Sequence, residues 1–234
     1  MKYPKAILVL LFLSITMSAY SQEDSTLQYL TQTKQTRKLM SPQDALQMLK
    51  DGNSRFINGT GFSRDYTQQA VETAEGQYPF GIILGCIDSR SPSEIIFDQG
   101  IGDIFNARVA GNIENDDILG SMEFACKVTG AKLIVVIGHT SCGAIKGACD
   151  DVHLGNLTTL LAKIKPAVDA VSYSGDRSSK NVEFVEKVAV QNVLLTMDNI
   201  KTKSSILKDL IDKGKILLIG AMYDLETGKV TFYE

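Results

Sequence analysis

Two short, wholly apolar runs constrain this chain most strongly, because each ends directly at a residue that can bind a metal. Residues 81–85 precede Cys86, and residues 133–138 precede His139. Short apolar runs are typical of strands that are buried on both faces of a parallel sheet. Open α/β sheets bind their ligands at the carboxyl ends of such strands. We therefore expect Cys86 and His139 to meet at one edge of one sheet.

Cys142 adds a third ligand, since it follows His139 after two residues. Two thiolates and one imidazole suit zinc. A structural zinc site normally has four protein ligands, whereas a catalytic site keeps the fourth position for water or substrate. Taken singly, each residue would more often be a small buried side chain or a hydrogen-bonded loop histidine. Together they predict one catalytic zinc ion held by Cys86, His139 and Cys142.

The remaining cysteines, Cys126 and Cys149, are not expected to bind this metal. Cys149 lies roughly 10 Å beyond Cys142 along a helix that rises 1.5 Å per residue. Cys126 is interpreted as a core position on a helix. A disulfide between Cys126 and Cys149 stays open, because oxidising compartments favour disulfides but nothing in the sequence pairs these two residues.

Alternation of apolar strands with helical segments predicts an α/β fold, with a mainly parallel central sheet flanked by helices. Ser41 as N-cap and Pro42 in the first turn begin a helix that should run to about Phe56 as an N-terminal helical arm. A long irregular segment then leads to the first strand. We expect further strands at 104–109, 133–139 and 216–223, an antiparallel C-terminal edge strand at 229–233, and helices near 115–129, 142–149, 156–171 and 181–201.

The first residues predict export. Lys2 and Lys5 flank an apolar run that is too short to span a membrane but suits a secretory signal peptide, and small residues follow at the usual cleavage spacing. We expect a signal peptide at 1–21, then a loosely ordered polar arm at 22–40. The mature protein would be periplasmic, with no stable membrane anchor. An uncleaved anchor is the less favoured alternative.

Length and composition indicate one domain, at 41–234. The chain has 234 residues, 44% of them hydrophobic and 22% charged, which suffices for one substantial core. A net charge of −3 predicts no basic surface for nucleic acid.

The motif Cys86-x-Asp88-x-Arg90, with a later His139-x-x-Cys142-Gly, resembles the β-class carbonic anhydrases. Further matching stretches extend the resemblance over most of the middle of the chain: 77–112, 120–125 and 139–147. The resemblance implies a zinc enzyme that reversibly hydrates carbon dioxide to bicarbonate and a proton, by attack of zinc-bound hydroxide. It also implies a homodimer or homotetramer in which the helix near 41–56 wraps the neighbouring subunit.

Asp88 and Arg90 are the predicted catalytic residues. The Asp88 carboxylate, two residues after a metal ligand, is placed to accept a hydrogen bond from the hydroxide and so orient it. Arg90 carries a rigid fork of donors that can hold a carboxylate by two bonds. In the family, this pair also decides whether the aspartate moves onto zinc. An isolated Asp–Arg pair would more often be a surface salt bridge.

The resemblance further assigns five residues to substrate binding. Gln77 matches a position whose amide binds substrate or bicarbonate across a subunit interface. Phe105, Ala110 and Phe124 match the apolar carbon dioxide pocket, and Phe124 replaces the tyrosine often found there. Gly143 would let the backbone approach the ligand, although it would also permit tight helix packing.

Other functions stay open on the sequence. The same scaffold and metal would serve hydrolysis of carbonyl sulfide or carbon disulfide, because a fold does not define a substrate. A non-catalytic zinc protein or a thiol redox protein is a third class, but no close Cys-x-x-Cys pair supports redox chemistry. His153 is a candidate proton shuttle, although a loop histidine beside two acids is more often simply solvated.

Overall fold

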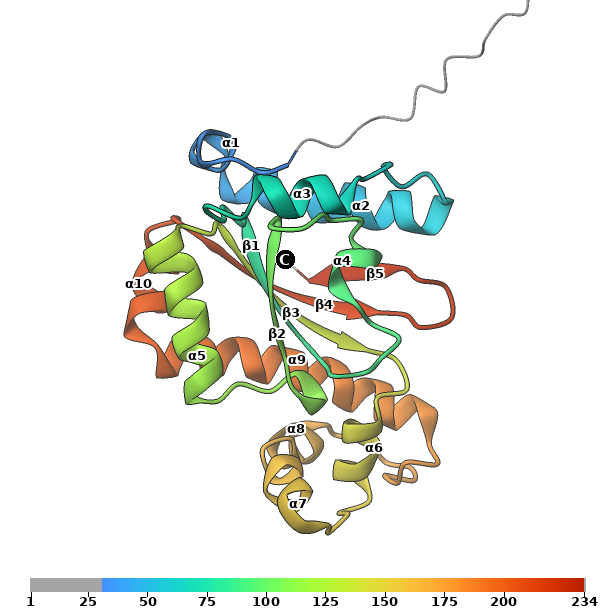
Figure 1. Ribbon diagram of the computed structural model, residues 1–234. Coiled ribbons are helices and arrows are strands. Elements are labelled where there is room, and N and C mark those ends of the chain that lie inside the picture. The colour runs from blue at the N-terminus through green and yellow to red at the C-terminus, as the bar shows by residue number, and fades with distance from the viewer. Residues whose placement is uncertain (1–30, 234) are drawn as a thin grey trace, which may run out of the picture.

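One five-stranded sheet organises the protein. A computed structural model describes residues 31–233; residues 1–30 and 234 lie outside the described part. The sheet has the order β2-β1-β3-β4-β5 (Figure 1). Its strands are β1 (Gly81–Gly85), β2 (Ile104–Arg108), β3 (Leu133–His139), β4 (Leu217–Tyr223) and β5 (Val230–Tyr233). The pairs β1–β2, β1–β3 and β3–β4 are parallel and β4–β5 is antiparallel, which confirms the predicted fold class.

Helices cover both faces of this sheet, because the strand residues alternate between two apolar layers. One layer packs under α2 (Pro42–Asn58) and α4 (Ser93–Ile96). The other layer packs under the longer set of helices: α5 (Asp116–Glu123), α6 (Gly143–Cys149), α7 (Gly155–Ala162), α8 (Lys165–Ala170), α9 (Val182–Lys203) and α10 (Ser205–Asp212). The described chain therefore forms three layers, helix–sheet–helix, around a central sheet.

The predicted N-terminal helical arm is present as α2. Ser41 accepts a hydrogen bond from the Asp44 backbone N–H while Asp44 accepts one from the Ser41 backbone, which is a capping box. The helix ends at Gly59, whose φ of 65° is left-handed, as is common at helix C-termini. Its apolar face, which includes Leu46 and Leu49, packs on the sheet.

The strand order places a topological switch point between β1 and β3. From β1 the chain crosses to β2 on one side, and it later returns to β3 on the other side. Leu84 on β1 is paired with Val136 on β3, so residues that follow shortly after this pair on both strands emerge at the same edge. Ligand sites of open α/β sheets form in this kind of crevice.

Several predicted boundaries were wrong. The helix expected at 156–171 is two helices, α7 and α8, because Pro166 lacks a backbone N–H and begins the second helix instead of continuing the first. The helix expected at 115–129 is present over 116–129, but only its first half, α5, is α-helical and its second half, η2 (Phe124–Thr129), is π-helical. Helices α4 and α10 were not predicted. Ser204 ends α9 and caps α10, so a single residue divides two helices.

The N-terminal region differs in part from the prediction. Residues 34–39 of the arm form α1 (Lys34–Leu39), capped by Thr33, and α3 (Tyr66–Glu72), capped by Asp65, lies in the segment expected to be irregular. The predicted signal peptide lies outside the described residues. Within residues 31–233, no helix combines the length and apolarity that crossing a membrane requires.

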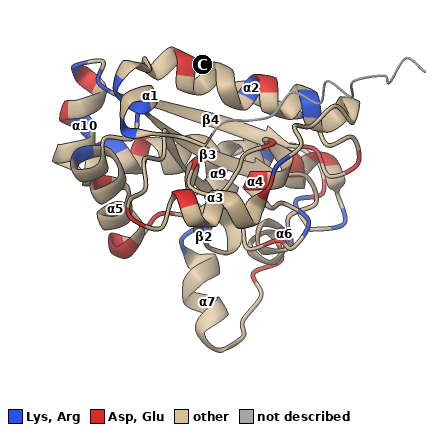
Figure 2. Cartoon of the chain, turned by 45° about the horizontal axis from the view of Figure 1, so that its top comes forward, with Lys and Arg blue, Asp and Glu red and all other residues tan. Residues whose placement is uncertain are grey.

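Residues of both charge signs are distributed over the described chain, while α7 carries no charged residue (Figure 2). This distribution fits the small net charge of −3.

Candidate metal centre

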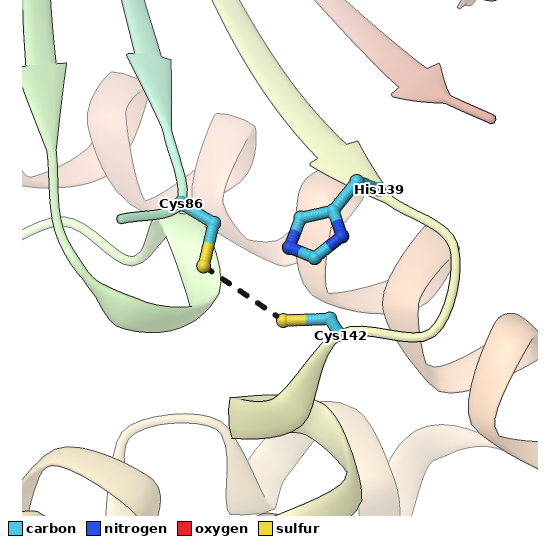
Figure 3. A group of neighbouring side chains, drawn as sticks. All are labelled: Cys86, His139 and Cys142. Atoms are coloured by element: carbon cyan, nitrogen blue, oxygen red, sulfur yellow. Dashed lines mark hydrogen bonds between the residues drawn. The ribbon is translucent and has the colours of Figure 1, made fainter. Parts of the chain in front are cut away.

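Cys86, His139 and Cys142 converge at the switch point (Figure 3). Cys86 follows β1 directly, His139 is the last residue of β3, and Cys142 precedes the first turn of α6. Their ligand atoms all lie within 4.8 Å of one another, and all three residues are buried. The fold thus brings together the three predicted ligands from two chain segments.

The His139 ring is oriented for binding through Nε2. Its Nδ1 lies 2.9 Å from the Thr140 carbonyl oxygen. A carbonyl can only accept, so Nδ1 carries the proton and the Nε2 lone pair is free. Among the described residues, this buried Nε2 has no hydrogen-bond partner. An unpaired buried nitrogen is costly, and a metal ion in the cluster would satisfy it.

The two sulfurs share one proton when no metal is bound. Cys86 Sγ and Cys142 Sγ lie 3.9 Å apart. The hydrogen bond from Cys142, against the opposing effect of burial, lowers the pKa of Cys86 to about 4. The same interaction raises the pKa of Cys142, because that thiol keeps the proton. Burial alone would lower the pKa of His139, but the nearby Cys86 thiolate outweighs it and raises that pKa.

Asp88 lies beside the cluster and is held by Arg90. Arg90 Nε donates to Asp88 Oδ1 at 2.9 Å and Nη2 donates to Oδ2 at 2.7 Å. Asp88 Oδ2 is 3.8 Å from His139 Nε2. The bonds from Arg90 hold the pKa of Asp88 well below its usual range, so the carboxylate is ionised at neutral pH. The pair predicted from the sequence is therefore formed, next to the free ring nitrogen.

Arg108, which sequence analysis did not single out, clamps the loop after β1. From the end of β2 its Nε donates to the Cys86 carbonyl at 2.8 Å and its Nη2 to the Asp88 carbonyl at 2.5 Å. One guanidinium thus fixes the backbone of both the metal ligand and the neighbouring carboxylate. The sequence signals were its place at the end of a predicted strand and its position within the stretch 77–112 that carries the family resemblance.

Glu186 on α9 anchors the loop between the other two ligands, and it was also missed. Its Oε1 accepts a hydrogen bond from the Ser141 backbone N–H at 2.8 Å. Ser141 has a φ of 55°, in the left-handed region that non-glycine residues seldom adopt. Thr140 is held from the opposite side, since its Oγ1 accepts from the Leu225 N–H at 3.0 Å. The loop is thus fixed from two elements distant in sequence.

The residues assigned to substrate binding are not all brought to the cluster within one chain. Ala110 adjoins Gly111, whose N–H donates to Cys86 Sγ at 3.4 Å, and Gly143 follows Cys142. Phe105 and Phe124 lie edge to face, with centroids 6.3 Å apart. They line a groove of about 700 Å³ over β2 and α5, and none of the three predicted ligands lines that groove.

Gly143 and Gln77 have contrasting surroundings. A Cβ built on Gly143 would meet nothing within 4 Å, so tight helix packing does not explain this glycine, and the space in front of it is open. Gln77 is exposed, in the loop that enters β1. It therefore lies toward the amino end of the strand whose carboxyl end carries Cys86.

The remaining candidates stay apart from the cluster. Cys126 and Cys149 are free thiols, so the open disulfide is not formed. Burial raises the pKa of Cys126 to about 12 and that of Cys149 to about 11, which leaves both protonated. His153 is exposed and its Nδ1 contacts the Asp151 carbonyl.

An open α/β sheet with a buried Cys–His–Cys cluster at its switch point defines the class of this protein: an α/β protein with a candidate metal site of three side chains. A sequence profile of the carbonic anhydrase family matches residues 81–230. The chain belongs to the β-carbonic anhydrases, a zinc-dependent enzyme family that acts on carbon dioxide and bicarbonate.

Individual relatives agree with this placement. Carbonic anhydrase 2 of Mycobacterium tuberculosis is 35% identical over 198 residues, covering 81% of this chain and 91% of the relative. A carbonic anhydrase of Mycolicibacterium smegmatis is 32% identical over 199 residues, covering 81% and 92%. The solved structure of the β-carbonic anhydrase CcaA superposes with a TM-score of 0.63 at 25% identity, over 81% of this chain and 87% of that one.

Proposed function

We propose that this enzyme reversibly hydrates carbon dioxide to bicarbonate and a proton, with one zinc ion per subunit bound by Cys86, His139 and Cys142. The observation that carries the proposal is the juxtaposition of the unpartnered His139 Nε2 with the two sulfurs and with the Asp88 carboxylate. Two thiolates and one neutral imidazole are a ligand set that zinc prefers, and three protein ligands leave one position for the reacting water.

Zinc bound there supplies a Lewis acid that lowers the pKa of water enough to provide hydroxide near neutral pH. The chain's own contribution is orientation. Asp88 is ionised and acceptor-only, so it would accept a hydrogen bond from the nucleophile and would orient it toward carbon dioxide. Arg90 keeps Asp88 in that position by its two parallel bonds.

A resting state with Asp88 bound to the metal would require these two bonds to break. With Asp88 engaged by Arg90, as it is here, the carboxylate would stay off a bound metal ion and the fourth position would be left for water.

The pocket for carbon dioxide is completed by a second copy of the chain in this proposal. The outer edge of β2 has no strand partner among the described residues. The Phe105–Phe124 groove lies on one side of it, and a second groove of about 530 Å³, which Ile95 and Ile101 help to line, lies beside it. Phe124 is 49% exposed. An edge strand flanked by exposed apolar side chains is typical of an interface.

In that dimer, Phe105, Phe124 and Gln77 would act on the partner's metal centre instead of their own. This arrangement accounts for their distance from the ligands within one chain. A solved comparison structure, at a TM-score of 0.60 and 25% identity, comes from a pair of tetrameric β-carbonic anhydrases of Sordaria macrospora.

The activity is tested by assaying carbon dioxide hydration on metal-analysed mature protein, beside hydrolysis of carbonyl sulfide and carbon disulfide. We expect one zinc per subunit and hydration as the dominant reaction. Cys142→Ser should abolish both zinc binding and turnover. Preferred hydrolysis of either sulfur substrate would replace the proposed reaction, and a Cys142→Ser variant with full zinc and turnover would refute the ligand assignment.

The interface is tested by sedimentation and activity of Ile95→Glu, since Ile95 is 60% exposed beside β2. We expect dissociation and loss of activity. Val182→Glu on α9, at a residue 62% exposed and on the opposite face of the sheet, is the matched control and should stay associated. A fully active wild-type monomer at assay concentration would contradict the shared site.

A further inference from the structure

A buried amide on α9 lies outside the ligand set and outside the residues assigned to catalysis. Asn192 is only 1% exposed, and its neighbours along the helix, Val188, Ala189 and Val193, belong to the apolar core. Burying an amide among such residues is unfavourable unless it is hydrogen-bonded. Asn192 Nδ2 donates to the Gly111 carbonyl at 2.8 Å, across 81 positions of sequence.

Gly111 is held in a conformation that other residues adopt poorly. Its φ is 74°, and an added Cβ would lie 2.5 Å from Ile164 Cδ1. The turn is closed by Asn112 N–H, which donates to the Val109 carbonyl at 2.9 Å. The hydrogen bond from Asn192 therefore holds one peptide group of a turn whose backbone conformation is already restricted.

The other polar group of Gly111 reaches the metal centre. Its backbone N–H donates to Cys86 Sγ at 3.4 Å. An N–H···S bond withdraws charge from a thiolate and directs its lone pairs, so it affects how the sulfur binds a metal. A continuous contact path thus runs from the side chain of Asn192 through Gly111 to a ligand atom.

Helix α9 also packs closely on β3, the strand that ends at His139. Gly138, directly before His139, lets α9 pack closely on β3, because an added Cβ there would lie 2.9 Å from Val193 Cγ2. Asn192 is the neighbour of Val193 in sequence. Helix α9, which lies behind the sheet in Figure 1, therefore packs closely on β3, the strand that carries His139. Through Asn192 the same helix also contacts the turn beside Cys86.

We propose that Asn192 is a positioning residue of the metal centre, acting through Gly111 on the Cys86 sulfur. This inference rests on the proposed zinc site. If Asn192 only stabilised the fold, its removal would lower the melting temperature and leave the metal's surroundings unchanged. If it positions the N–H···S donor, its removal changes zinc affinity and the electronic environment of the sulfur.

The test uses the full mature chain and two readouts: zinc affinity by chelator competition, and the thiolate-to-metal charge-transfer band of the Co²⁺-substituted protein. Asn192→Leu keeps the volume and removes the donor. We expect zinc affinity to fall about 10-fold to 100-fold, as for other residues that support metal ligands, and the cobalt band to shift. Thr196→Val, at a residue equally buried on the same helix, should leave both readouts at wild-type values.

Wild-type zinc affinity and an unshifted cobalt band in Asn192→Leu would overturn the proposal, whatever its melting temperature. Should that variant fail to fold, Asn192→Asp, which keeps the shape but replaces the donor by an acceptor, is judged by the same two readouts. A wild-type chain that binds no zinc would instead overturn the proposed function, and this inference with it.

Discussion

Arg90 holds the Asp88 carboxylate by two parallel hydrogen bonds, of 2.9 and 2.7 Å, and its backbone N–H adds a third at 2.9 Å to Oδ1. The residues are two apart in sequence, so the bonds close a tight loop immediately after Cys86, a proposed metal ligand. This geometry leaves Asp88 Oδ2 directed at the cluster, 3.8 Å from His139 Nε2.

Replacing either member of this pair should separate metal binding from catalysis. Asp88→Asn keeps the size but loses the charge and one acceptor, and Arg90→Ala removes both guanidinium bonds to the carboxylate and keeps only the backbone one. Neither removes a proposed ligand, so both variants should retain zinc while turnover falls by about 10²-fold to 10⁴-fold, the usual effect of losing a positioned acid–base group. Zinc analysis and steady-state hydration kinetics measure the two effects.

Asp169→Asn is a suitable control for that experiment, since Asp169 forms an exposed ion pair with Lys165 on α8. It should behave as wild type. If Asp88→Asn and Arg90→Ala also kept wild-type rates, the pair would be structural, and the orientation mechanism would be wrong even with the zinc site intact.

Zinc affinity should rise with pH. The pKa of Cys86 is lowered to about 4, so this sulfur is already ionised at neutral pH, whereas the raised pKa of Cys142 keeps its proton there. Zinc binding must displace that proton, which makes affinity increase about tenfold per pH unit. Below the raised pKa of His139 a second proton is displaced and the slope should steepen.

Chelator competition under reducing conditions at several pH values measures this slope. An affinity independent of pH would mean that both thiols are already ionised without metal, contrary to the shared proton described here.

Glu186 should be needed for the loop that carries His139 and Cys142. Glu186→Ala removes the acceptor of the Ser141 N–H, and we expect zinc affinity to fall about 10-fold to 100-fold. Glu186→Gln retains a carbonyl oxygen and should recover most of the loss. Glu183→Ala, one turn earlier on α9 and bonded to Tyr173 and Lys187, is the matched control. Equal zinc affinities for Glu186→Ala and Glu186→Gln would show that the hydrogen bond from the Ser141 N–H does not contribute to zinc binding.

Asp98 should be important for stability, away from the metal. It is 9% exposed and accepts from Arg55 Nε at 2.5 Å and from Arg64, which is 2% exposed. In Asp98→Asn, the asparagine can adopt the local φ of 46°. The guanidinium groups of Arg55 and Arg64, however, lose the carboxylate that they contact. We expect the free energy of unfolding to fall by about 3–5 kcal/mol, measured by denaturant titration.

The control is Asp212→Asn, because the Lys208–Asp212 pair is more than half exposed on both sides. Removing an exposed pair typically changes stability by about 0–1 kcal/mol. An Asp98→Asn effect no larger than that would show that solvent or other partners compensate the two arginines.

Much of the fold was predictable because its signals are local. The apolar runs at 81–85 and 133–138 form strands β1 and β3. Each strand is buried on both faces, as its apolar sequence predicted. The ligands follow those runs directly, so the parallel sheet was enough to predict that they meet. Pro166 is a local signal too: the single helix predicted at 156–171 was wrong because proline lacks the backbone N–H that a continuous helix needs there.

What surrounds the ligands was decided by tertiary structure alone. Arg108 lies on a strand and Glu186 and Asn192 lie on a helix, and the local sequence does not show which distant group the side chain of each will contact. Their partners are the Cys86 carbonyl, the Ser141 N–H and the Gly111 carbonyl, 22, 45 and 81 positions away. Backbone groups have the same chemistry at every residue, so no sequence pattern records which of them a distant side chain will reach. The sequence by itself determined the three candidate metal ligands and the sheet that carries them, whereas only the packing of α9 and β2 decided how those side chains are held.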